Sequence, residues 1–181
     1  MDNPTTLLVA IMYVTIVATG LVNVLMALSD IVGGKLKTDS IHTGWLVLLL
    51  LVYLNFFWQT TAILEIEGWD FLAFVSFIIG PIVLLFATNL LTSPADTEQG
   101  AMRDQYYFKQ SARFFVLLAL VQAWTIGLDL VFDNVGFATY LTAGIGVLFI
   151  ILIITKNYRA HFAGLTAIGL VFILRMIMQA L

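Results

Sequence analysis

Polar side chains lie inside long apolar stretches of this sequence, at spacings that place them together on helices. The run Ser111–Phe132 carries Gln122 near its middle, Thr125 one turn later and Asp129 near its end. Separations of three and four residues put these side chains on one helical face. In hydrocarbon such a face must turn toward protein or water, because lipid cannot form hydrogen bonds with it. The segment therefore predicts a polar surface inside a membrane bundle.

Three further apolar stretches carry polar residues in the same way. The first has Asn23 one turn after Thr19, the second has Asn55 and Gln59, and the last has Arg175 followed by Gln179. We expect these faces to meet and line a narrow polar path across the membrane. The predicted path or ligand-binding residues are Asn23, Asn55, Gln59, Gln122, Thr125, Asp129, Arg175 and Gln179.

Arg175 is the most informative of these residues, because it carries a charge within a predicted span. A charged side chain at the centre of a spanning helix costs about 2.5–3.5 kcal/mol on insertion scales, so it rarely faces lipid. Asp129 is the acidic residue that lies within a predicted span and away from a membrane-boundary turn, which suggests an ion pair between the two. The alternatives are an arginine that reaches the membrane surface and a pair that only holds helices together. In the functional hypothesis this pair forms an outer filter or gate, and Asn55 and Gln122 form a constriction at mid-depth.

Composition and motifs exclude several other chemistries. The chain has no cysteine, which removes disulfides, thiolate metal sites and cysteine nucleophiles together. No predicted span contains a lysine, and motifs for hydrolases, zinc proteases and phosphate binding are absent. His42 and His161 are weak candidates for metal or haem ligation, each at a predicted membrane boundary. We expect no enzyme activity, no metal and no cofactor.

The elements that position these residues are six apolar runs. Of the 181 residues, 61% are hydrophobic and 10% are charged, which is typical of the membrane class and not of soluble domains. Each run is near the 20 or so residues that a spanning helix needs. The predicted fold is all-α, one domain over 1–181 that forms a bundle of six transmembrane helices. The predicted spans are 5–28, 43–64, 69–91, 111–132, 136–154 and 158–181, with a cytoplasmic interfacial helix at 94–110 that runs into the fourth span.

The basic residues predict the orientation. Lysine and arginine lie in or beside the first, third and fifth loops, and the second and fourth loops have none. The positive-inside rule then places these three loops in the cytoplasm and both termini on the non-cytoplasmic side. The basic residues on the predicted cytoplasmic side are Lys35, Lys37, Arg103, Lys109, Arg113, Lys156 and Arg159. We expect an integral membrane protein, in a bacterial inner membrane.

Two other stretches carry small residues at helical spacing. One face holds Ser76, Gly80 and Ala87, and another holds Thr142 and Gly146. Small residues allow helices to approach closely, either within one chain or between chains.

Two functions are consistent with these features. The first is a small channel or transporter for a small solute or ion, working as a homo-oligomer. The second is a non-catalytic membrane subunit or scaffold of a larger complex, bound to a membrane-protein partner. Both have the lipid bilayer as a partner, and neither involves nucleic acid, since no basic run is present.

Overall fold

The computed structural model describes residues 4–35, 39–66, 68–92, 103–132 and 135–180, leaving aside the side chains of 103–109 and 178–180. Every regular element in this described part is an α-helix. The helices are α1 (Pro4–Val32), α2 (Ser40–Trp58), α3 (Thr60–Ile63), α4 (Phe71–Thr92), α5 (Arg103–Val131), α6 (Phe137–Ile154) and α7 (Tyr158–Ala180).

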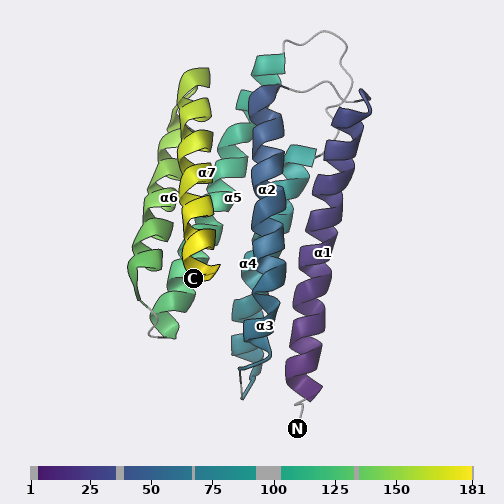
Figure 1. The fold of residues 1–181 in the computed structure, drawn as a ribbon, viewed down its shortest axis with the longest axis vertical. Coiled ribbons are helices and arrows are strands. Elements are labelled where there is room, and N and C mark those ends of the chain that lie inside the picture. Colours follow the sequence, from purple (N-terminus) through teal and green to yellow (C-terminus); the bar gives the residue numbers. More distant parts are fainter. Residues whose placement is uncertain (1–3, 36–38, 67, 93–102, 133–134, 181) are drawn as a thin grey trace.

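The contacts between the six long helices close into a ring, which Figure 1 views from the side. α1 packs between α2 and α4, α5 packs between α4 and α6, and α7 joins α6 to α2. Contacts of α7 with its two neighbours are the least extensive among the long helices. The first residues of α1 and the last residues of α7 both lie toward one end of the ring, which is the lower end in Figure 1.

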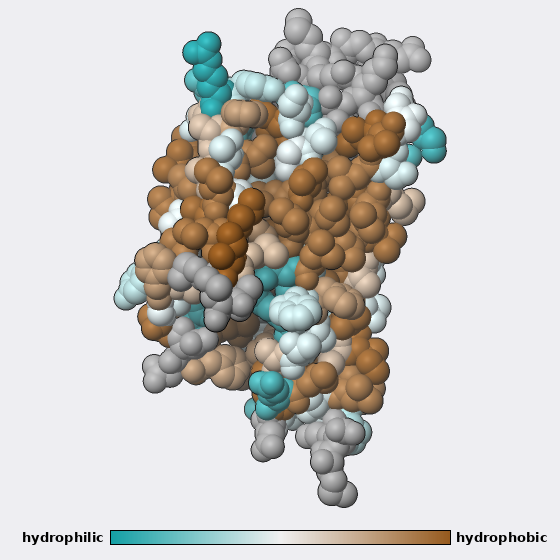
Figure 2. Space-filling model, in the orientation of Figure 1, coloured by the Kyte–Doolittle hydropathy of each residue, from teal (hydrophilic) through white to brown (hydrophobic). Residues whose placement is uncertain are grey.

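The prediction of six apolar helices is confirmed. Each spanning candidate has a stretch that is long and apolar enough to cross a membrane. The second candidate is the sum of α2 and α3, which are separated at Gln59. Apolar side chains cover most of the face that Figure 2 shows, where they are brown, and many large apolar side chains are exposed. An apolar outer surface is favourable in lipid, whereas its exposure to water would be unfavourable.

The helix ends show how the chain satisfies its backbone. Asp70 Oδ1 accepts a hydrogen bond from the N–H of Ala73 at 2.7 Å, in the first turn of α4. Gly34 and Gly68 adopt positive φ angles of 70° and 77° in the turns after α1 and before α4. These left-handed turns favour glycine, which has no Cβ to clash with the backbone.

The expected interfacial helix at 94–110 runs into the fourth span over its described part. α5 extends without a break from Arg103 to Val131. Residues 94–102 lie outside the described residues. Good helix formers continue through this junction, and neither glycine nor proline interrupts it.

Candidate functional site

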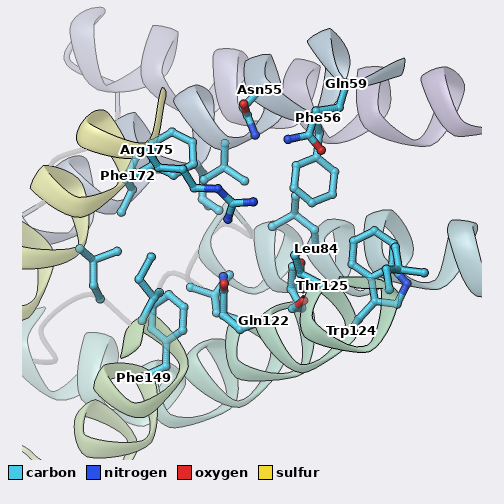
Figure 3. Close-up of a pocket in the computed structure, with 18 of the residues that line it drawn as sticks. Asn55, Phe56, Gln59, Leu84, Gln122, Trp124, Thr125, Phe149, Phe172 and Arg175 are labelled. Atoms are coloured by element: carbon cyan, nitrogen blue, oxygen red, sulfur yellow. Dashed lines mark hydrogen bonds between the residues drawn. The ribbon is translucent and has the colours of Figure 1, made fainter. Parts of the chain in front are cut away.

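A cavity of about 390 Å³ lies inside the ring of helices. All six long helices line it, with most of the lining from α2, α5 and α7. Its size falls in the range of about 300–1,000 Å³ that ligand pockets occupy. Figure 3 shows the side chains that surround it. This central space is the candidate site.

Six of the eight predicted path residues line this cavity. They are Asn55 of α2, Gln59 between α2 and α3, Gln122, Thr125 and Asp129 of α5, and Arg175 of α7. In Figure 3 the side chains of Asn55, Gln122 and Arg175 extend from three different helices into one shared space. Each of the six is partly buried. The structure thus brings together polar residues that are up to 120 positions apart along the chain.

The other two predicted residues lie elsewhere. Asn23 does not line the cavity: its side-chain Nδ2 donates to Oδ1 of Asn89 at 3.0 Å, which joins α1 to α4. Asn89 is exposed on the outer surface of the ring, so this polar pair faces outward. Gln179 belongs to α7, but its side chain lies outside the described residues.

The charged residues are not joined directly. The carboxylate of Asp129 and the guanidinium of Arg175, both described, are more than 4 Å apart and form no salt bridge. Thr139 Oγ1 instead donates to Asp129 Oδ2 at 2.7 Å, and Arg175 Nη1 donates to Thr142 Oγ1 at 2.9 Å. The predicted ion pair is therefore replaced by two hydrogen bonds to α6, whose threonines are three residues apart on one face.

Aromatic side chains close one end of the cavity. Trp45 contacts Phe114, Phe115 and Phe149, with ring centroids 5.0–6.2 Å apart. These four side chains are at most 3% exposed, and the buried His161 ring packs against Phe115. The cluster fills the ring where α2 and α7 begin, so the cavity is blind at that end.

The opposite part of the cavity is polar. Gln59, Asp129 and Arg175 lie toward this end, near the points where α2, α5 and α7 finish. Figure 2 shows hydrophilic surface in a hollow on the face of the molecule, flanked by apolar surface. The loose packing of α7 borders the same region. The cavity thus leads from an aromatic floor to a polar mouth.

Trp124 forms part of the wall, and its position depends on α4. Its indole N–H donates to the carbonyl of Ser76, and its ring stacks on Phe56 at 6.2 Å. Gly80 lies directly against the indole: a Cβ there would be 2.3 Å from the nearest ring carbon. The small-residue face of α4 thus packs against α5 within the chain. The small-residue face of α6 also packs against α5, since a Cβ at Gly146 would be 3.5 Å from the Cβ of Gln122.

The side chains of the two histidines lie within hydrogen-bond distance of carbonyl groups at helix ends. Nε2 of His42 lies 2.8 Å from the carbonyl of Leu91 near the end of α4, and Nε2 of His161 lies 2.7 Å from the carbonyl of Thr155 after α6. Each ring nitrogen thus satisfies a carbonyl that no longer has a helical partner. Within the described residues no three acidic or histidine side chains are grouped to hold a metal.

Sequence reasoning overlooked several lining residues. Trp45, Phe149 and Phe172 line the cavity, and Thr139 and Thr142 hold its two charges. A signal existed for some of them, because Trp45 is ten residues before Asn55 and Phe172 is three before Arg175, spacings that keep each pair on one helical face. Threonine pairing across helices has no comparable signal in the sequence.

Fold and site together define a ring of helices, with six spans long and apolar enough to cross a membrane, around a blind cavity that is aromatic at its floor and polar at its mouth. Comparisons with protein-family models, curated protein sequences and solved structures found no match to the chain.

Proposed function

We propose that this chain is an integral membrane carrier that binds a small solute in its central cavity. The observation that carries the proposal is the convergence of Asn55, Gln122 and Arg175 on a cavity that is blind at one end. Amide and guanidinium groups in such a space can replace the water that a solute loses on entry. Neither an enzyme activity nor a cofactor is part of the proposal.

The blind end favours a carrier over an open channel. A pore would need a continuous polar route, whereas Trp45, Phe114 and Phe115 fill the ring at one end and are at most 1% exposed. A carrier exposes its site to one side at a time, with the other side closed by packed side chains. The loosely packed α7 is the element that we expect to move.

The distribution of basic residues supports an orientation. With both termini outside and Lys35, Lys156 and Arg159 in the cytoplasm, the polar mouth opens outward. The aromatic floor then faces the cytoplasm. We propose a bacterial inner membrane as the location of this carrier.

The absence of cysteine from the chain makes accessibility simple to measure. Gln122→Cys lines the cavity, whereas Glu65→Cys and Lys156→Cys are exposed at opposite ends of the ring. In intact cells, a membrane-impermeant maleimide should label Gln122→Cys and Glu65→Cys, and should label Lys156→Cys only after lysis. Labelling of Gln122→Cys only after lysis would contradict an outward-facing mouth.

Transport itself is tested in proteoliposomes with a panel of labelled monocarboxylates, amino acids and sugars. We expect saturable uptake of at least one solute, without the unitary currents of a channel in planar bilayers. Gln122→Leu should abolish that uptake. Asn23→Leu is the matched control, since it removes a similar amide outside the cavity.

One observation favours a second function, that of a membrane subunit. The Asn23–Asn89 pair lies on the outer face of α1 and α4, where amides in hydrocarbon would gain from a protein partner. A second copy of this chain or another membrane protein would meet that need. Absence of uptake for the whole panel, with a stable partner that is lost in Asn89→Leu, would favour this function.

A further inference from the structure

The two charged groups of the cavity differ in how well the protein satisfies them. Asp129 accepts a hydrogen bond from Thr139, whose Oγ1 also accepts the backbone N–H of Gly136 at the start of α6. A carboxylate near the first turn of a helix is stabilised by the unpaired N–H groups and by the helix dipole. The negative charge is therefore held by the protein itself.

Arg175 is less well satisfied. Its Nη1 donates to Thr142, but its buried Nε has no acceptor among the described residues. Thr142 is a neutral partner, and its own hydroxyl donates to the carbonyl of Ala138. A guanidinium can donate five hydrogen bonds and cannot lose its charge in a protein. The cavity thus contains a positive charge with unused donors.

Other donors in the cavity lack acceptors too. The indole N–H of Trp45, which is 1% exposed, has no acceptor in the described part of the chain. The side-chain amides of Asn55, Gln59 and Gln122 form no hydrogen bonds with other described residues, and each amide can donate. Arg175 Nε and Trp45 Nε1 are the buried cavity donors that lack acceptors among the described residues, and the amides can add their N–H groups to satisfy an anion.

The rest of the cavity is suited to an apolar body. Phe56, Phe172 and Trp124 surround the polar groups in Figure 3, and Phe149 lies toward the floor. Flat aromatic walls favour ring systems in stacked or edge-on contact. An inorganic anion would leave this apolar surface unused.

From these observations we propose that the ligand is an organic anion, a carboxylate on an aromatic or apolar body. The carboxylate binds the guanidinium of Arg175 with help from the amides of Asn55 and Gln122, and the body lies among the aromatic walls. This inference rests on the proposed function, because it names the substrate class of the same cavity. Asp129 is not a ligand for the anion: it repels the carboxylate and favours its placement at Arg175.

Three compounds with one shape and different charge test this proposal. They are 2-naphthoate, 2-naphthamide and 2-naphthylmethylamine, which at neutral pH are anionic, neutral and cationic. Binding to the purified full chain in lipid nanodiscs is measured by isothermal titration calorimetry, with empty nanodiscs as the blank. We expect 2-naphthoate to bind at least about tenfold more tightly than the other two, as charge-assisted hydrogen bonds predict.

Variants assign the effect to named residues. Arg175→Gln should weaken 2-naphthoate by about tenfold to a hundredfold and leave 2-naphthamide unchanged, while Arg175→Lys retains part of the preference. Arg159→Gln is the control, because it removes an exposed cation outside the cavity. Should Arg175→Gln fail to fold, Asp129→Asn serves instead, and should tighten 2-naphthoate while weakening the amine.

The outcomes separate this inference from the proposed carrier. Equal or tighter binding of the amide or the amine, or no binding of any of the three, overturns the inference. A preference for 2-naphthoate that survives in Arg175→Gln also overturns it. Arg175-dependent binding of 2-naphthoate without uptake into proteoliposomes supports the inference and contradicts the carrier. Saturable uptake of a sugar with no binding of 2-naphthoate supports the carrier and overturns the inference.

Discussion

Gly80→Ala gives the most direct test of how α4 positions the wall of the cavity. A Cβ at residue 80 would be 2.3–2.4 Å from three ring carbons of Trp124, far inside van der Waals contact. The indole cannot simply rotate away, because its N–H is bonded to the carbonyl of Ser76 and its ring is stacked on Phe56. Relief of the overlap must therefore move α4, α5 or the indole.

The expected magnitude follows from three opposing effects. Overpacking of this kind costs about 1–3 kcal/mol, and loss of the indole hydrogen bond costs about 1 kcal/mol. Alanine is favoured over glycine within a helix by at most about 1 kcal/mol. The clash outweighs the propensity gain, so we expect Gly80→Ala to lower the free energy of unfolding by about 1–3 kcal/mol.

Reversible unfolding in SDS, followed by circular dichroism, measures this change. Gly144→Ala is the matched control, because a Cβ at this helical position would meet nothing within 4 Å. It should leave the free energy of unfolding unchanged or slightly higher. Gly80→Ala combined with Trp124→Leu should be less destabilised than the sum of the two single changes, since the smaller side chain makes room. A Gly80→Ala variant as stable as Gly144→Ala would refute the packing argument.

Three further substitutions are measured in the same unfolding assay. Gly20→Ala should cost about 1–3 kcal/mol, because its Cβ would be 2.2 Å from the buried Tyr53 ring; equal costs in the wild-type and Tyr53→Leu backgrounds would contradict this cause. His161→Ala should cost about 2–4 kcal/mol, since it opens a space in the aromatic floor and frees the carbonyl at the end of α6. Thr142→Val keeps the side-chain shape but removes the acceptor of Arg175, and should cost about 1–3 kcal/mol. A Thr142→Val variant with wild-type stability would show that Arg175 does not depend on this hydroxyl.

Much of the fold was predictable because its cause is local. A stretch of about 20 apolar residues must satisfy its backbone internally when it is surrounded by hydrocarbon, and the helix is the structure that does so. Each of the six spans can therefore be predicted from its own residues alone.

The candidate site was predictable in part for a related reason. Helical periodicity shows which residues share a face, and this grouped Asn55 with Gln59 and Gln122 with Asp129. It does not show how far each helix is rotated within the bundle. The polar face of α1 turns toward α4, so Asn23 pairs with Asn89 and lies outside the cavity.

The sequence by itself determined the class of structure, six apolar helices with polar faces, because hydropathy and helical spacing act over neighbouring residues. Only the tertiary structure decided that the cavity ends blindly at Trp45, and that α6 threonines separate Asp129 from Arg175. Both features depend on contacts between residues far apart in the chain. Such contacts are selected by the packing of whole helices, and nothing in the spacing of a single helix records them.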